Sequence, residues 1–179
     1  MTDSPPPITT LDSHIAWECP WYRIRQDRIR LPDGSEGIYN VVQKNDCVFI
    51  VPLTAAGEVV MIYCYRHTLG EWCWELPAGS LKDGQSPLQA AQSELWEEVG
   101  GAAADWRLLL KVSTMKGLGT ERAYIYLATG VLLGQAHPEP AEVITVHTLP
   151  VAEALRMARA GEINDAASVM ALLLAENEI

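Results

Sequence analysis

The sequence predicts an α+β fold with a mixed β-sheet, preceded by an N-terminal region of antiparallel strands. Strand-like apolar runs fill most of the first half of the chain, one strongly capped helix follows, and further strands precede two C-terminal helices. This order favours an α+β fold or a mixed αβα sandwich over a regular βαβ repeat. The 179 residues, 49% hydrophobic and 20% charged, fit one domain with a core and a small appendage.

The N-terminal quarter of the chain divides into a tail and an extended region. Residues 1–12 contain three consecutive prolines and no periodicity, so we expect a disordered tail there. Residues 13–45 hold two extended runs, WYRIRQDRIRL and EGIYNVVQ, around the turn signal PDG, which predicts a β-hairpin or meander. Residues 46–179 are predicted to form the main domain.

Strands are predicted through most of the main domain. CVFIVPL (47–53) and VVMIYCY (59–65) are apolar throughout, as strands buried on both faces are, and the turn AAGE joins them. The remaining strand candidates are WCWEL before Pro77, WRLLLKVSTM (106–115), AYIYLATGVLL (123–133) and EVITVHTL (142–149).

The clearest helix is predicted over residues 86–101. Ser86 suits the N-cap, Pro87 suits the first helical position, and Gln89 completes a capping box. Two glycines provide the stop. The predicted buried stripe consists of residues spaced by three and four, namely Leu88, Ala91, Leu95 and Val99. Two more helices are predicted at 150–161 and 164–179, the second capped by Asn164 or Asp165.

Three glutamates crowd one part of the first helix. Glu94, Glu97 and Glu98 lie at roughly 0°, 300° and 40° around it. Like charges at this spacing repel by roughly 0.2–0.5 kcal/mol per pair. A solvated acidic face is the simple interpretation. The alternative is a site for Mg²⁺ or Mn²⁺, which take hard oxygen ligands, and the neighbouring turn ELPAG and glycine-rich loop KGLGTER favour it.

Charge and cysteine content narrow the partners and the compartment. A net charge of −10 argues against nucleic acid, which requires a basic surface, but a divalent ion could still mediate binding of a phosphorylated small molecule. The four cysteines form no CxxC pair and no secretory signal is visible, so we expect a cytoplasmic protein. The longest apolar run is too short to cross a bilayer, so no membrane association is expected.

Residues 79–101 resemble the Nudix box, Gly-x5-Glu-x7-Arg-Glu-apolar-x-Glu-Glu-x-Gly-apolar. The matching positions are Gly79, Glu94, Leu95, Glu97, Glu98 and Gly100. Gln85 replaces the first glutamate, Ser93 replaces the arginine, and Gly101 replaces an apolar residue. The segments RIRLPDGSEGIYNVV, VPLTAAGEVVMIYCYR, WELPAG and GLGTER are similar to the ADP-ribose pyrophosphatase branch of the family.

This resemblance implies a Nudix-type αβα sandwich and a homodimer in which residues 13–45 form the dimerisation region and help build the partner's substrate site. It also implies hydrolysis of a nucleoside diphosphate linked to another group, with Mg²⁺ or Mn²⁺ as cofactor. The implied metal ligands are Glu94, Glu98, Glu97 and the Ala78 carbonyl. The implied general base is Glu121 or Glu97.

The resemblance also suggests residues that bind the substrate. Arg66 would contact phosphate or ribose, although an ion pair with Glu71 or Glu75 is an equal alternative. Glu75 would lie near the terminal ribose or orient Arg66, and Gly79 would allow close approach of the ligand. Trp21 and Tyr22 would stack on adenine across the dimer, unless they merely pack in the hairpin.

Several functions remain open at the level of sequence. The leading one is hydrolysis of ADP-ribose to AMP and ribose 5-phosphate, and the same chemistry on GDP-mannose or another nucleotide sugar is an alternative. A non-catalytic nucleotide-sugar sensor would explain the altered box, but it would not need to keep all four glutamates. A purely structural dimer would leave the acidic stripe unexplained. We expect an active enzyme.

Overall fold

The computed structural model describes residues 6–139 and 141–178, which divide into two compact units. The first unit contains the residues up to Asn45 together with Ser113–Arg122. The second unit contains Asp46–Val112 and the residues from Ala123 onward. Within the described ranges, no helix is long and apolar enough to cross a membrane.

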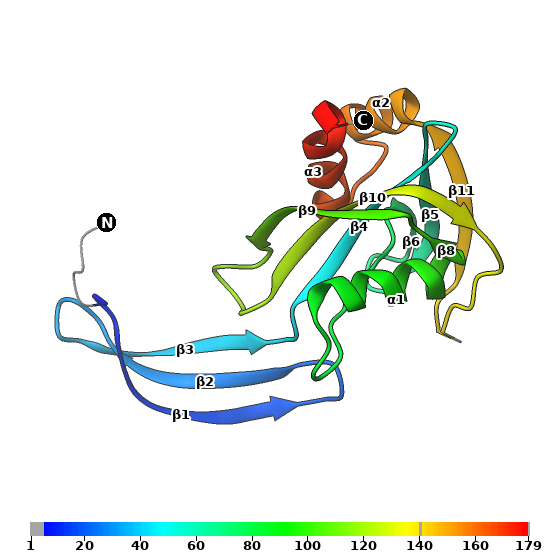
Figure 1. Ribbon diagram of the computed structural model, residues 1–179. Helices are drawn as coiled ribbons and strands as arrows, with labels where there is room; N and C mark the ends of the chain where they lie inside the picture. The colour runs from blue at the N-terminus through cyan, green and yellow to red at the C-terminus, as the bar shows by residue number, and fades with distance from the viewer. Residues whose placement is uncertain (1–5, 140, 179) are drawn as a thin grey trace. The chain divides into compact units, whose positions relative to one another are not determined.

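The first unit is built on a three-stranded antiparallel sheet in the order β1 (Thr9–Glu18), β2 (Arg23–Arg30) and β3 (Glu36–Gln43) (Figure 1). The predicted meander therefore has one strand more than the sequence suggested. Thr9 pairs with Arg30, so residues 9–12 are part of a strand and not of the predicted tail. Alternation does not reveal this strand because nearly every residue of β1 is exposed. The first five residues of the predicted tail lie outside the described residues.

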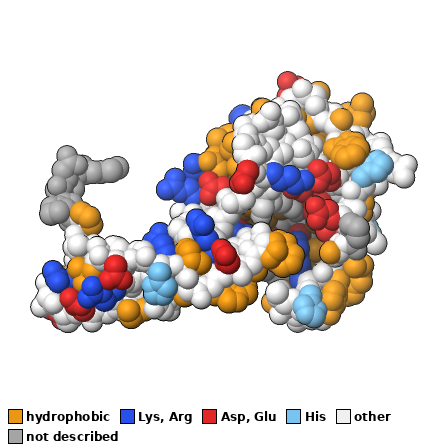
Figure 2. Space-filling model, turned by 90° about the horizontal axis from the view of Figure 1, so that it is seen from below, with side chains coloured by type: hydrophobic (Ala, Val, Ile, Leu, Met, Phe, Trp, Pro, Cys, Tyr) orange, Lys and Arg blue, Asp and Glu red, His pale blue; other side chains and the backbone are white. Residues whose placement is uncertain are grey.

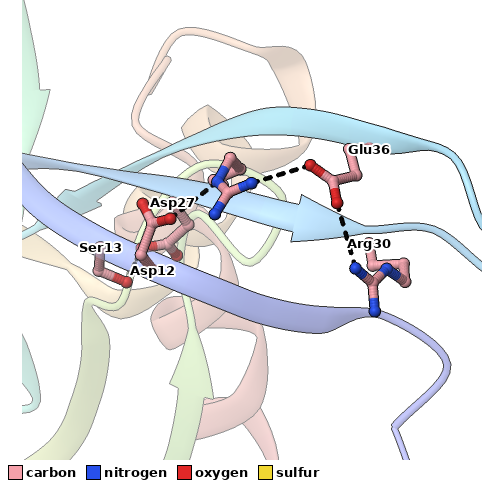
Figure 3. A network of polar contacts seen from close by, with 6 residues as sticks. Asp12, Ser13, Asp27, Arg30 and Glu36 are labelled. Atoms are coloured by element: carbon pink, nitrogen blue, oxygen red, sulfur yellow. Dashed lines mark hydrogen bonds and ion pairs between the residues drawn. The ribbon is translucent and has the colours of Figure 1, made fainter.

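Cross-strand polar contacts hold the register of this sheet. On one face, Arg28 joins Asp12 of β1 to Glu36 of β3 at 2.7 and 3.0 Å (Figure 3). On the other face, the buried Asp27 accepts a hydrogen bond from Ser13 Oγ at 2.6 Å and pairs with Arg25 at 2.8 Å, and these contacts lower the pKa of Asp27. Exposed ion pairs contribute only about 0–1 kcal/mol each, so they select the register more than they stabilise the sheet.

The second unit contains a mixed eight-stranded sheet. Its central order is β11 (Ile144–Pro150), β5 (Glu58–Arg66), β4 (Cys47–Thr54), β10 (Arg122–Leu133) and β8 (Gly101–Ala102). Strands β4 and β10 run parallel, and their neighbours pair antiparallel. Three more strands attach to this path: β6 (Glu71–Glu75) on β5, β7 (Ala78–Ser80) on β4 and β9 (Asp105–Ser113) on β10.

Helices cover both faces of this sheet, as an αβα sandwich requires (Figure 1). Helix α1 (Pro87–Val99) packs on one face, where Ile50 of β4 meets Leu95. Helices α2 (Val151–Ala160) and α3 (Ala166–Ala175) pack on the other, where the next residue, Val51, joins the cluster of Leu172, and a short 3₁₀ turn at Glu176–Glu178 follows. The predicted mixed α+β sandwich is confirmed. The central strands are buried on both faces, as their apolar sequences predicted.

Helix α1 begins and ends where the sequence predicted. Ser86 and Gln89 form the capping box, and Gly100 closes the helix at φ 65°, in the left-handed region that favours glycine. The predicted stripe is wrong at Leu88, which is 38% exposed, because burial begins only after the first turn of the helix. Ala90 is buried in its place, and so are Glu94 and Glu98.

Candidate functional site

Two carboxylates lie inside the packed face of α1. Glu94 and Glu98 are only 9% and 3% exposed. On the helix they project at roughly 0° and 40°, between Ala90 at roughly 320° and Val99 at roughly 140°, so they fall within the buried arc. Glu97, at roughly 300°, lies at the edge of that arc and remains partly exposed. The helix therefore buries two of the three glutamates predicted to bind metal.

Gly79 of β7 lies directly against this pair. A Cβ built on Gly79 would lie 2.1 Å from the carboxyl carbon of Glu94, closer than any real contact. The neighbouring Ala78 N–H donates a hydrogen bond to Glu98 Oε2 at 2.8 Å. The glycine is thus required because a carboxylate occupies the space that any other side chain would fill.

Burial makes the ionised form of both carboxylates unfavourable. It is the main cause that raises the pKa of Glu94 to about 7, and the charge of Glu97 adds to the effect. Burial also raises the pKa of Glu98 well above its usual range, against the opposing hydrogen bond from Ala78. A cation at this point would offset both the desolvation and the repulsion.

A hard divalent cation fits these donors chemically. The buried carboxylates provide negative oxygen atoms, and that of Glu94 lies directly against the bare Cα of Gly79. The side chains are not already arranged as a ligand cage: in residues 6–139 and 141–178, no three acidic, imidazole or thiol groups are gathered around one point. Glu97, for example, lies 3.5 Å from Lys82 Nζ.

Arg66 and Glu75 form an ion pair just before the turn Glu75–Gly79, which leads from β6 into β7. Arg66 Nε donates to Glu75 Oε1 at 2.8 Å, and Nη2 contacts Oε2. The two residues lie on adjacent strands, β5 and β6, and this contact raises the pKa of Arg66. Of the two ion-pair partners predicted for Arg66, the structure selects Glu75. The arginine side chain is still 46% exposed, so a ligand can also reach it.

The two altered polar positions of the box contact each other. Gln85 Nε2 donates to Ser93 Oγ at 3.2 Å, and Gln85 Oε1 accepts from Lys82 N–H at 3.0 Å. A neutral bridge therefore fastens the loop before α1 to the helix, at the place where the common box has an arginine and a glutamate. A groove of about 740 Å³ runs beside this bridge, lined by Asp83, Gly84, Gln85, Gln89, Gln92, Ser93, Trp96 and Glu97.

Two further carboxylates that were not predicted from the sequence, Glu139 and Glu142, act on the buried pair. Their charges raise the pKa of Glu94, and that of Glu142 also raises the pKa of Glu98. Their loop is fastened to α1, because His137 N–H donates to Glu97 O at 2.7 Å and the His137 ring stacks on Trp96 at 4.6 Å between centroids. The signal available in the sequence was the acidic, proline-rich stretch HPEPAE between two strands.

The other predicted site residues belong to the first unit. Glu121 is 5% exposed, pairs with Lys44 and accepts a hydrogen bond from Thr114 Oγ1 at 2.7 Å. Trp21 is 76% exposed, so most of its side-chain surface is open to solvent. Tyr22 packs against Trp17, with ring centroids 5.3 Å apart, and is still 40% exposed. The predicted site residues of the second unit lie on α1, on β7 and on the adjacent strands β5 and β6.

Comparisons with known proteins find similarity over most of the chain. The family model described as NUDIX domain matches residues 43–173, and the one described as nucleoside diphosphate sugar hydrolase N-terminal domain matches residues 8–42. An ADP-ribose pyrophosphatase of Mycobacterium tuberculosis (strain ATCC 25618 / H37Rv) is 38% identical over 85% of this chain and 75% of its own length.

Two other similar proteins widen the comparison. A CMP-5'-(N-acetyl-N-hydroxy-3-aminopropyl)phosphonate hydrolase of Streptomyces rubellomurinus (strain ATCC 31215) is 29% identical over 81% of this chain and 70% of its own. A crystal structure of an ADP compounds hydrolase superposes with a TM-score of 0.86 at 22% identity, covering 99% of this chain and 96% of the other. That likeness concerns the fold.

The raised pKa of Glu94 predicts that the metal-free protein loses stability as the pH rises. Between the ordinary value of 4.5 and about 7, the folded protein binds more protons at this group than the unfolded chain does, so its free energy of unfolding falls through that window. In EDTA, the melting temperature of the wild type minus that of Glu94→Gln should fall from pH 5 to pH 8. Added Mg²⁺ should restore it at pH 8 by binding the folded state. A wild-type curve parallel to that of Glu94→Gln would contradict this assignment.

The Gln85–Ser93 bridge predicts coupled effects on metal binding. Ser93→Ala should weaken Mn²⁺ binding by about tenfold, the low end of the effect usual for groups that orient ligands. Gln85→Glu combined with Ser93→Arg should bind at least as tightly as the parent, because it rebuilds a charged bridge in place of the neutral one. Mn²⁺ titration calorimetry measures both, and Gln92→Glu, on the exposed side of α1, controls for added charge. A double variant weaker than Ser93→Ala would disprove the bridge.

Proposed function

Since the chain belongs to the Nudix family of hydrolases, we propose that it cleaves the pyrophosphate bond of ADP-ribose or a related nucleoside diphosphate sugar in a reaction that depends on Mg²⁺ or Mn²⁺. ADP-ribose would give AMP and ribose 5-phosphate. The observation that carries the proposal is the pair of buried carboxylates, Glu94 and Glu98, held against Gly79. The similarity to an ADP-ribose pyrophosphatase and the match to a nucleoside diphosphate sugar hydrolase domain support this substrate class.

Each residue of the site then has a chemical task. Glu94, Glu98, Glu97 and the Ala78 carbonyl would hold the ion, which neutralises phosphate charge and activates water when bound. Arg66, oriented by Glu75, offers guanidinium donors to a phosphate or ribose oxygen. Gly79 leaves the backbone bare where the ligand approaches.

A carboxylate must also accept a proton from the attacking water. The resemblance to the Nudix box and its branch implies Glu121 or Glu97 for this role. Glu121 is engaged by Lys44 and Thr114, and Glu97 lies near Lys82. Among the described residues Glu142 pairs with no cation, and its Oε2 accepts a hydrogen bond from the Glu139 N–H at 2.8 Å. Because it lies on the loop that His137 fastens to α1, and its charge acts on both Glu94 and Glu98, we propose it as the first candidate for the general base.

The first unit supports a homodimer in the cytoplasm. Hydrophobic side chains are scattered among charged ones on the surface of this unit (Figure 2). The large hydrophobic side chains that it exposes include those of Ile15, Trp17, Trp21, Ile38 and Tyr39, and the consecutive Ile38 and Tyr39 point to opposite faces of β3. Exposed hydrophobic side chains of this size favour an interface, and the exposed Trp21 and the adjacent Tyr22 would stack on the base of the substrate. All four cysteines are free thiols, in keeping with a reducing compartment. Light scattering of the purified protein at several concentrations tests the dimer.

A second candidate keeps the chemistry and changes the base or the leaving group. Stacking tolerates any base, so GDP-mannose or a cytidine compound of the kind hydrolysed by the Streptomyces relative would fit the same site. A non-catalytic nucleotide-sugar sensor is the alternative from a different class. The retained set of four glutamates, Glu94, Glu97, Glu98 and Glu121, speaks against it, because a pure binder need not keep all of them.

The substrate proposal predicts metal-dependent turnover led by ADP-ribose. Phosphatase-coupled phosphate release should be measured for a panel of nucleoside diphosphate sugars, with and without Mg²⁺ or Mn²⁺. Glu98→Gln should lower activity by more than about 100-fold, beyond the loss usual for residues that only orient a ligand. No turnover of any compound, together with thermal stabilisation by one of them, would favour the sensor. Full activity of Glu98→Gln would exclude Glu98 as a metal ligand.

The base assignment predicts a separation between turnover and metal affinity. Glu142→Gln should lower kcat by about 10²–10⁴-fold while Mn²⁺ affinity stays near that of the wild type, since general-base catalysis contributes this much. Glu139→Gln, on the same loop, is the matched control. If Glu121→Gln or Glu97→Gln shows this pattern and Glu142→Gln does not, the role belongs to that glutamate.

A further inference from the structure

One buried hydrogen bond ties the C-terminal helix to the turn that carries Glu75 and Ala78. The Leu76 N–H donates to Ser168 Oγ at 2.9 Å, across 92 residues of sequence, and both residues have no exposed surface. Ser168 Oγ in turn donates to Asp165 Oδ2 at 2.6 Å. Asp165 is the N-cap of α3 and also accepts the Ser168 N–H at 2.8 Å. The helix cap and the turn therefore share one hydroxyl group.

This hydroxyl completes the fixation of the turn. Arg66 of β5 holds Glu75, Ile50 N–H of β4 donates to Pro77 O at 2.9 Å, and Glu98 of α1 accepts from Ala78 N–H at 2.8 Å. Leu76 is the residue between these contacts, and its anchor comes from α3. Four successive residues are thus held by four different elements of the second unit.

The sheet itself does not satisfy the Leu76 N–H. The ladder between β5 and β6 ends with Glu75 opposite Ile62, and the chain then turns toward β7. A buried N–H without a partner is costly, so the chain must supply an acceptor at this point. Pro77 has no N–H of its own, and Leu76 is therefore the residue through which a donor can fix the first half of the turn.

We propose that Ser168 is a positioning residue for the site on the opposite face of the sheet. It would set the path of the backbone from Glu75 to Ala78, and through it the Arg66–Glu75 pair and the contact of Ala78 with Glu98. Asp165 keeps the Ser168 hydroxyl pointing so that its lone pair meets the Leu76 N–H. The inference rests on the proposed function, since it assigns Ala78, Glu98 and Arg66 their roles.

The test compares Ser168→Ala with a variant that weakens the same layer without touching the turn. Ala154→Gly removes a buried methyl from α2, which packs in the same core cluster. Both variants should lower the melting temperature. Only Ser168→Ala should weaken Mn²⁺ binding, measured by calorimetry without nucleotide, by about 10–100-fold, as groups that orient ligands do. Its KM for the best panel substrate should rise as well, because Arg66 loses its fixed partner.

Two milder variants keep the test decisive if Ser168→Ala does not fold. Ser168→Cys keeps a weak acceptor and should give an intermediate Mn²⁺ affinity. Asp165→Asn keeps a good N-cap oxygen and should bind Mn²⁺ like the wild type. Wild-type Mn²⁺ affinity in every Ser168 variant that folds would overturn the positioning role while leaving the proposed function intact. A wild-type protein that binds no Mn²⁺ would overturn both.

Discussion

The burial of two carboxylates on one helix is the constraint around which the second unit is arranged. Glu94 and Glu98 resist ionisation because they have little exposed surface and repel each other. The structure keeps them there by removing every side-chain atom from Gly79 and by directing the Ala78 N–H at Glu98. A fold selected for stability alone would place leucines at these positions. The energetic cost of burying the two carboxylates is explained if a cation, itself bound to a phosphorylated ligand, neutralises them.

The turn from Glu75 to Gly79 transmits that constraint to the rest of the unit. Leu76 and Pro77 lie between the ends of β6 and β7, so the peptide groups here cannot all be paired within the sheet. Contacts from β4, α1 and α3 satisfy peptide groups of the turn, and Arg66 of β5 holds the side chain of Glu75. Because the two helical layers reach the same few peptide groups from opposite faces of the sheet, packing of α3 and geometry at α1 are not independent. This is how a helix far from the carboxylates can influence them.

Local signals predicted the parts of the structure that depend on neighbouring residues. The capping box, the apolar central strands and the sandwich order were all visible in sequence, and so was the resemblance of residues 79–101 to the Nudix box. What escaped prediction depends on contacts between distant residues. Strand β1 is exposed and polar, so only its pairing with β2 reveals it. Glu142 and Ser168 become relevant only when a loop and a helix are folded back onto α1 and the Glu75–Gly79 turn.

The altered box positions favour an enzyme over a binding protein on physical grounds. Replacing a glutamate by Gln85 and an arginine by Ser93 removes one negative and one positive charge, so the net charge near the carboxylates is unchanged. The two new side chains still bond to each other, and Lys82 supplies a cation near Glu97. A neutral hydrogen bond is weaker than a charged one, but it still joins the loop before α1 to the helix. A chain drifting away from catalysis would be expected to lose the buried carboxylates first, because their burial is what costs stability.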